Sequence, residues 1–188
     1  MGLAMRAKVC KVCKADFNPM RSLQSVCGPR CAVKHSTLAN NRSREKARRD
    51  ALRVRKDRVK TRAEWAKEAQ AAFNSYIRAR DSLLPCISCG QSPNQGQRHA
   101  SHYRSVAAAS HIRYNCWNVH ASCAQCNSIK SGNVVEYRIA LVRKIGPGRV
   151  GALEHSNYQR TFEIDELKRI KRIFSRRAKH YKKLRGIA

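Results

Sequence analysis

Cys86-Ile-Ser-Cys89 and Cys123-Ala-Gln-Cys126-Asn127 are the two ends of the stretch that decides the fold of this chain. Two CxxC pairs are the ligand set of a structural zinc ion, because four thiolates complete a tetrahedral shell around the metal. A long insert separates the pairs, and we expect the chemistry there. Its candidate polar side chains are His99, His102, His111, Asn118 and His120.

The segment from Ser82 to Val135 contains no Asp and no Glu. A catalytic metal in this segment would therefore be held by imidazole, amide and phosphate groups. Nucleases that use two metal ions normally hold them with several carboxylates. The sequence therefore favours a nuclease site with a single metal ion over most other nuclease designs.

The charge of the whole chain points to a polyanionic partner. The formal net charge is +28, from 40 Lys and Arg against 12 Asp and Glu, and nucleic acid is the leading partner for such a surplus. No apolar run approaches the roughly 20 residues of a membrane-spanning helix. The first residues lack the apolar region of a signal peptide, so a cytoplasmic location is expected. The chain has nine cysteines, and in a cytosolic protein their CxxC pairs indicate zinc rather than disulfides.

A second cysteine frame lies near the N-terminus. Cys10 and Cys13 are followed, after thirteen residues, by Cys27 and Cys31, which predicts a zinc finger within a domain of residues 1–40. Whether this finger is only a structural staple or also contacts DNA is left open by the sequence. The ninth cysteine, Cys116, has no partner in either set and is predicted to be a small buried residue of a strand.

Between the two frames, residues 41–62 are predicted as a basic helical linker. Eleven Lys or Arg and three acidic residues lie between Arg42 and Arg62, which favours contact with phosphates over a merely solvated linker. The apolar residues that follow, from Trp65 to Ile77, recur at helical spacing and predict an amphipathic helix over residues 63–80. This helix leads into a zinc-clamped core, predicted as a domain of residues 63–146.

Within the core we expect a strand over residues 99–103, a second strand over residues 112–117 and a helix over residues 123–131. A helix over 134–145 should end at Gly146. A short helix over 150–155 and a final helix capped by Thr161 and running to about Leu184 make up the last predicted domain, residues 147–188. The predicted fold class is thus a small zinc-stabilised α+β protein with basic helices at the C-terminal end.

Several motifs within and beside the second cysteine frame resemble those of a known protein family. Ala100-Ser-His-Tyr-Arg104, Asn118-Val-His120 and Cys123-Ala-Gln-Cys126-Asn127, with Arg113-Tyr-Asn115 and Ser131-Gly-Asn133, resemble the phage NinG (Rap) recombination nucleases, of the HNH or His-Me finger type. The resemblance spans nearly the whole chain and is strongest over residues 85–137. It implies a ββα-metal core and a phage-encoded protein acting in the host cell.

The resemblance implies endonucleolytic cleavage of branched DNA, such as four-way junctions and D-loops, during recombination. It assigns His102 as the general base, with Asn118 and Asn127 in the catalytic signature. One divalent ion, Mg²⁺ or Mn²⁺, would lie between the phosphate and Asn127, beside the two structural zinc ions. Three cations are candidates for contact with the DNA: Arg104, Arg113 and Lys130.

The chain departs from the pattern at Ser101. Many His-Me finger enzymes carry a metal ligand directly before the general base, and serine is a poor substitute. His99 and His120 are the candidate replacements, although His99 and His102 face opposite sides of a strand. Asn118 is expected to fix a loop by hydrogen bonds rather than to bind metal.

Two other functions remain open from the sequence. One is a zinc-dependent nucleic-acid-binding accessory protein of recombination without catalysis. The other is an HNH enzyme with a different DNA target, such as a homing or restriction-type nuclease. A homodimer is the expected assembly, because a four-way junction is resolved by two cuts related by two-fold symmetry. Contacts with other recombination proteins are also possible.

Overall fold

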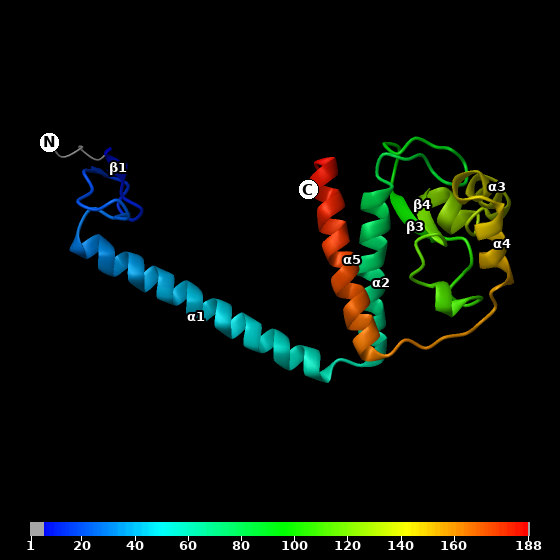
Figure 1. Ribbon diagram of the computed structural model, residues 1–188, viewed down its shortest axis with the longest axis horizontal. Coiled ribbons are helices and arrows are strands. Elements are labelled where there is room, and N and C mark those ends of the chain that lie inside the picture. Colours follow the sequence, from blue (N-terminus) through cyan, green and yellow to red (C-terminus); the bar gives the residue numbers. More distant parts are fainter. Residues whose placement is uncertain (1–5, 188) are drawn as a thin grey trace. The chain divides into compact units, whose positions relative to one another are not determined.

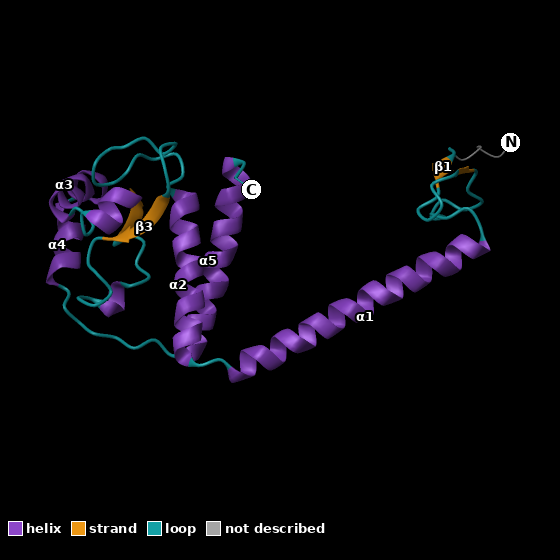
Figure 2. Cartoon of the chain, turned by 180° about the vertical axis from the view of Figure 1, so that it is seen from behind, coloured by secondary structure: helices purple, strands orange, loops and turns teal. Residues whose placement is uncertain are grey.

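The computed structural model describes residues 6–187 and divides into two compact units between Lys60 and Thr61. Both are small and contain one two-stranded antiparallel sheet, with helices making up most of the rest (Figure 1, Figure 2). The predicted α+β class is therefore confirmed. Within the described residues, no helix is long and apolar enough to cross a membrane.

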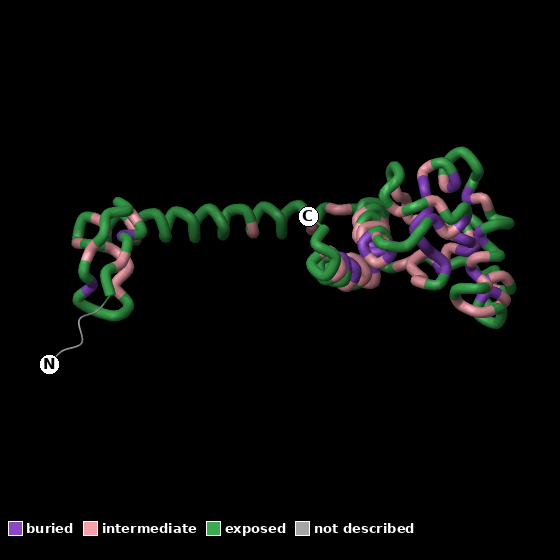
Figure 3. The backbone as a smooth tube through the Cα atoms, turned by 90° about the horizontal axis from the view of Figure 1, so that it is seen from above, coloured by how far each residue is buried: buried purple, intermediate pink, exposed green. Residues whose placement is uncertain are grey.

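The first unit consists of the N-terminal cysteine frame and one long helix. Strand β1 (Lys8–Val9) pairs with β2 (Asp16–Phe17), and α1 runs over Pro29–Val59. Proline is favoured at a first helical position because it has no N–H to leave unpaired, so α1 begins inside the second pair of cysteines. The basic segment is helical as expected, but the predicted boundary between residues 40 and 41 lies within this helix. None of the side chains of α1 is buried (Figure 3).

The second unit begins with α2 (Arg62–Arg80), close to the predicted helix. Thr61 caps it in a capping box with Glu64, which satisfies free backbone donors at the helix start. Phe73 and Ile77 lie on its buried face. That face packs along α5 (Ile164–Arg185), so the leading and final helices of this unit lie side by side (Figure 1).

The core hairpin consists of β3 (Arg98–His102) and β4 (Val119–Cys123), paired antiparallel with Ala100 opposite Ala121. One face of the hairpin packs against α2 through Val119, and the other contacts α3 (Val134–Ile145) through Tyr137. Helix α4 (Pro147–His155) packs on α3. The sheet is thus enclosed between helices, with the β3 edge toward the polar residues described below.

The predicted strand over residues 112–117 is wrong. This segment instead forms a 3₁₀ turn, η1 (Ser110–Ile112), and two further turns, in which Asn115 accepts the N–H of Trp117. Ile112 and Tyr114, whose spacing suggested a strand, anchor the loop in two different apolar clusters. The second strand lies later, at residues 119–123, where all five residues are buried despite two polar side chains.

The predicted helix over residues 123–131 is shorter than expected. Cys123 ends β4, and a single π-helical turn, η2 (Gln125–Ile129), follows. Gly132 and Asn133 then adopt positive φ angles, which ends the turn and redirects the chain into α3. The order of two strands and a short helix is present, and α3 occupies the predicted residues.

Two helix starts differ from expectation. Helix α4 begins three residues before Val150, at Pro147. Helix α5 is capped by Glu163, in a capping box with Glu166, and not by Thr161. The residues just before it are held in an extended form, because Phe162 packs on the Tyr114 ring with centroids 5.1 Å apart.

Candidate functional site

The first cysteine cluster has the geometry of a zinc site. The sulfur atoms of Cys10, Cys13, Cys27 and Cys31 all lie within 4.8 Å of one another, and Cys27 Sγ is 3.6 Å from both Cys13 and Cys31. A tetrahedral Zn–S distance of about 2.3 Å requires sulfur atoms about 3.8 Å apart, whereas a disulfide requires about 2.05 Å. Burial opposes ionisation of Cys10, but nearby backbone N–H groups outweigh it and lower its pKa to about 6.

The second cluster closes on the core hairpin. The four sulfur atoms of Cys86, Cys89, Cys123 and Cys126 also lie within 4.8 Å of one another, with Cys89 and Cys123 3.8 Å apart. The N–H of Cys123 lies 3.3 Å from Cys86 Sγ. Burial opposes ionisation of Cys86, but backbone N–H groups outweigh it and lower its pKa to about 7. Both predicted four-cysteine sets are therefore assembled and fit zinc.

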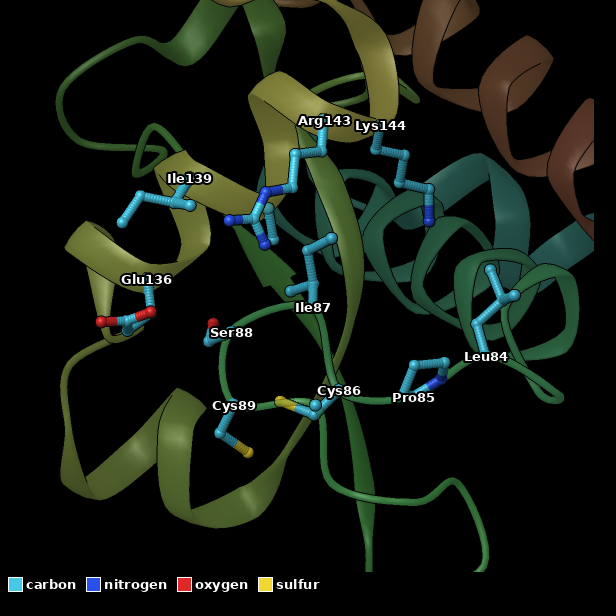
Figure 4. A pocket seen from close by; sticks show the side chains of 12 residues that line it. Leu84, Pro85, Cys86, Ile87, Ser88, Cys89, Glu136, Ile139, Arg143 and Lys144 are labelled. Carbon is cyan, nitrogen blue, oxygen red and sulfur yellow. The ribbon is translucent and has the colours of Figure 1, made fainter.

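An apolar groove runs beside the second cluster. Its volume is about 610 Å³, and it lies between the first cysteine pair and α3, with Ile139, Arg143 and Lys144 on the α3 side. Figure 4 shows Cys86 and Cys89 on the other side of this groove. Its lining combines apolar residues with the charged Glu136, Arg143 and Lys144, whereas the hollow at β3 is lined almost entirely by polar side chains.

Cys116 belongs to neither cluster. It lies in the loop before β4 and not in a strand, and its side chain is only partly buried against the cluster that includes Phe73 and Val119. Burial raises the pKa of its thiol. The predicted buried strand position is corrected in this respect, and the structure gives Cys116 a packing role.

A polar hollow of about 500 Å³ lies along β3. His99 and Asn127 meet there, with His99 Nδ1 3.1 Å from Asn127 Nδ2. Helix α2 contributes Asn74 and Arg78 to the lining, and β3 contributes Arg98. The structure thus brings together a histidine and an amide from the predicted set with two arginines that the sequence did not indicate.

His102 lies on the same strand but on its other face from His99, because side chains alternate along a strand. Its Nε2 atom is 3.0 Å from the carbonyl oxygen of Arg113. A carbonyl only accepts, so the ring must carry its proton on Nε2, which leaves the lone pair on Nδ1. Burial lowers the pKa of His102, and the nearby Arg113 guanidinium adds to this. A neutral imidazole with a free Nδ1 is suited to accept a proton.

Asn118 is buried and holds a loop, as expected. Its Oδ1 accepts the N–H of Arg104 at 2.8 Å, and its Nδ2 donates to the Arg104 carbonyl at 3.0 Å. The Arg104 guanidinium is in turn bonded to the carbonyls of Leu153 and Glu154 and to Asn157. Arg104 therefore ties the loop to the end of α4, and both terminal nitrogens of its guanidinium donate within the protein.

His120 is a packed residue. The hydroxyl of Tyr137 donates to the Ser101 carbonyl, so the Nδ1 of His120, 3.2 Å from that hydroxyl, is the donor in their contact. Burial lowers the pKa of His120 to about 3. Of the two candidate replacements for a missing ligand, His99 contacts Asn127 and His120 contacts Tyr137.

The two other candidate cations differ in their surroundings. Arg113 donates from Nε to Gln70 on α2 at 2.6 Å. Lys130 is exposed at the end of η2. The contribution of α2 to this site was missed from the sequence. The signal that could have revealed it is the polar spacing Gln70, Asn74 and Arg78, four residues apart and so on one helix face.

A family model described as "Bacteriophage Lambda NinG protein" matches residues 3–184. The chain is 37% identical to "Protein ninG" of Escherichia phage lambda over 190 aligned positions, gaps included, which cover 94% of this chain and 93% of that protein. It is 37% identical to "Protein ninG" of Enterobacteria phage H19B over 193 aligned positions, which cover 95% of this chain and 96% of that protein. The protein of that name from Salmonella phage P22 is 36% identical over 190 aligned positions, which cover 94% of this chain and 93% of that protein. No solved structure gives a significant match.

Proposed function

The chain belongs to the NinG family, and on that premise we propose that it is a metal-dependent endonuclease that cleaves branched DNA of recombination. The observation that carries the proposal is the arrangement along β3: His102 with a free Nδ1, and the His99–Asn127 contact at a hollow lined by two arginines. A fixed tautomer alone would also suit a packed histidine such as His120, so the proposal rests on His102 together with the His99–Asn127 contact.

The proposed base is His102. Its Nε2 proton is held by the Arg113 carbonyl, so Nδ1 takes a proton from the attacking water. This arrangement resembles the orientation of catalytic histidines by a backbone or carboxylate partner on the second ring nitrogen. Because burial lowers its pKa, His102 stays neutral at physiological pH and is ready to act.

Hydrolysis of a phosphodiester also needs positive charge near the phosphate. In the structure the lone pair of His99 Nδ1 accepts from Asn127 Nδ2. If the Asn127 side chain turned its oxygen toward the hollow, His99 and Asn127 would together hold one divalent ion, Mg²⁺ or Mn²⁺, which supplies this charge when bound. Two arginines line the same hollow, so their repulsion disfavours a cation on its own. We therefore expect metal and DNA phosphate to bind together.

The two four-cysteine clusters are assigned a structural role. Each of their four positions is filled by a thiolate, which leaves no open coordination position for water or substrate. The second zinc would hold the first cysteine pair against the end of β4 and the start of η2, where Asn127 follows the last ligand. It thus fixes the position of Asn127 without taking part in the reaction.

The substrate and assembly follow from the charge and from the reaction. A chain with a net charge of +28 is suited to contact phosphates, which position DNA but do not read its sequence. Selection by the shape of a branch is therefore favoured over selection by sequence. Two symmetric cuts in a four-way junction would be made by a homodimer, acting alongside other recombination proteins.

The test is cleavage of an end-labelled four-way junction beside a linear duplex of the same sequence. Each substrate is incubated with Mg²⁺ or Mn²⁺, and a reaction without either ion serves as the control, because a chelator would also remove the structural zinc ions. We expect cutting of the junction that requires metal and falls by about 10²- to 10⁴-fold in His102→Ala, since that is the usual contribution of a general base. The matched control is His155→Ala, an exposed histidine of α4, which should cut at the wild-type rate.

Binding of the junction by His102→Ala is measured in parallel. Retained binding with lost cutting supports the assignment of His102. Tight binding by the wild-type protein without cutting in either metal would instead support the accessory DNA-binding function, and the absence of a metal ligand at Ser101 would then be the first cause to examine.

A further inference from the structure

Helix α2 presents a row of polar side chains to the β3 side of the hairpin. Gln70 Nε2 donates to Asn74 Oδ1 at 2.7 Å, and Gln70 Oε1 accepts from Arg113 Nε at 2.6 Å. Arg78 continues the row one turn later and is exposed in the polar hollow. This row runs beside β3, so that Gln70 lies near the loop holding His102 and Arg78 near Arg98.

Arg98 is bonded within the protein by only one of its three guanidinium nitrogens. Its Nη2 donates to the Leu84 carbonyl at 2.9 Å, whereas Nε and Nη1 are buried with no hydrogen-bond partner among the described residues. Buried donors without acceptors are costly, and charged groups are the most costly of all. An anion in the hollow would relieve this cost if the guanidinium turned toward it.

We propose that Arg78 and Arg98 form a subsite for a DNA backbone phosphate that flanks the phosphate cleaved beside His102. The inference rests on the proposed function, because it takes His102 as the point of cleavage. Arg98 and His102 lie four residues apart on one face of β3, which is about 13 Å at a rise of about 3.3 Å per residue. The two arginines therefore reach a different phosphate from the one at the base.

The chemistry of the hollow favours a phosphodiester backbone over a base or a nucleotide. The described residues that line it are two arginines, three side-chain amides, a histidine and an alanine, so an aromatic platform for base stacking is lacking there. Guanidinium groups bind phosphate oxygens with paired hydrogen bonds, and amides add neutral donors. The hollow is also open on its outer side, as a continuous DNA strand requires.

The subsite gives α2 a role in placing the substrate. Contacts with phosphates fix the register and direction of a DNA strand without reading its bases. A strand held at Arg78 and Arg98 would run along the β3 edge toward His102, with the His99–Asn127 contact in the same hollow as the two arginines. Selection by shape would then arise because only certain branches can follow this path.

The experiment measures binding of the same four-way junction by the full chain at several salt concentrations, without Mg²⁺ or Mn²⁺ so that no cutting occurs and without a chelator so that the structural zinc ions stay bound. We expect Arg78→Gln and Arg98→Gln each to reduce the slope of log K against log salt by about 0.7 to 0.9, the value for one phosphate contact. At 0.1 M salt this corresponds to about five- to eightfold weaker binding for each variant. The control is Arg138→Gln, whose guanidinium is already paired with Glu154 on α4.

Arg138→Gln removes the same formal charge and should leave the slope unchanged. Because Arg98 also bonds Leu84, its variant is checked for folding by tryptophan fluorescence, and Arg78→Gln, at an exposed position, provides an independent test. Wild-type slopes in folded Arg78→Gln and Arg98→Gln would overturn the subsite. A wild-type protein that binds the junction but never cuts it would overturn the proposed function and leave the binding result standing.

Discussion

The contact that places α2 against the hairpin is a buried ion pair, and its removal gives a quantitative test of the fold. Arg80 and Asp81 are bonded through both carboxylate oxygens, each at 2.7 Å, and the Asp81 side chain is 3% exposed. Asp81 also accepts the N–H of Ala121 at 3.0 Å. Arg80 donates to the carbonyls of Cys116 and Val119.

Asp81→Asn keeps the size of the side chain but removes its charge. Burial opposes ionisation of Asp81, but Arg80 outweighs it and lowers the pKa of the carboxyl, so the native pair is charged at neutral pH. Removing one partner of a buried pair costs about 3–5 kcal/mol, because the other charge is left uncompensated. An asparagine oxygen can still accept one bond, so we expect the lower end, about 3 kcal/mol.

The assay is urea unfolding followed by tryptophan fluorescence. Trp65 and Trp117 are the only tryptophans of the chain and both lie in the unit of residues 61–188, so the signal reports that unit alone. Asp165→Asn is the control, because its pair with Lys168 is exposed, with side-chain exposures of 93% and 47%. Exposed pairs contribute less than about 1 kcal/mol.

The reasoning would be refuted if Asp81→Asn lowered the free energy of unfolding by less than about 1 kcal/mol, with the same dependence on urea as the wild type. A buried Arg80 without its partner charge should destabilise the protein by more than that. It would mean that the Arg80 guanidinium reaches water in the folded state. The contact of α2 with β4 would then be maintained by apolar packing alone.

Three further predictions concern the metals, the base and the loop. The chain should bind two zinc ions, as measured by elemental analysis. Cys86→Ser should bind one zinc ion and Cys116→Ser should still bind two. A loss of zinc from Cys116→Ser would contradict the assignment of the ligands. Because burial lowers the pKa of His102, the initial rate of cleavage should stay constant as the pH falls to about 6.5 and decline only below that pH. A decline that begins at higher pH would exclude a neutral, buried histidine as the base. Arg104→Gln should lower the free energy of unfolding by about 1–3 kcal/mol in the fluorescence assay and leave the salt slope of DNA binding unchanged, whereas a reduced slope would show that Arg104 contacts phosphate after all.

The helices and the cysteine frames could be predicted because their signals are local. Thr61 with Glu64 marks the start of α2, and Gly146, at a φ of 85°, marks the end of α3. CxxC spacing is set by the tetrahedral shell of a single ion, so sequence alone assigns both ligand sets. In each case the residues that determine the structure lie within a few positions of one another or share one metal.

The wrong predictions concern segments whose structure is determined by contacts with residues distant in the sequence. Ile112 and Tyr114 are spaced as in a strand, but each packs into a different apolar cluster. Strand β4 alternates apolar Val119, Ala121 and Cys123 with two polar residues, as a half-exposed strand would, but helices cover both of its faces and the polar residues are buried as well. A cap at Thr161 failed for a similar reason, since Phe162 is held against Tyr114, from another part of the chain.

For the candidate site, motif spacing identified His102 and Asn127 as residues of interest but not their neighbours. The contact of His99 with Asn127 depends on how η2 turns after the second zinc cluster, which a spacing does not specify. Arg78 and Arg98 are two among 40 basic residues, and only folding brings these two to one hollow. Charge alone could not single them out.

The two edges of the core hairpin differ in a way that explains why the site forms at β3. Ala121 of β4 donates its N–H to Asp81, and its carbonyl accepts the N–H of Ile87, 3.1 Å away. Its backbone groups are thus used on the outer side, so the Ala100–Ala121 pair is not a hydrogen-bonded pair of the ladder. By the same alternation, the N–H and carbonyl of Ala100 point away from β4.

Ala100 lines the polar hollow, so the β3 edge, to which its outward backbone groups belong, borders the space in which we place the DNA phosphate. The β4 edge is closed by the Asp81 carboxylate and by the first cysteine pair, whereas the β3 edge leaves backbone groups free to bind a substrate. Both contacts are made with the backbone of Ala121: Asp81 accepts its N–H, and Ile87, within the first cysteine pair, donates to its carbonyl. The zinc cluster and the buried ion pair therefore act together: each occupies the β4 edge, and the hollow forms at the other edge, where Arg98, His99 and Ala100 of β3 line it.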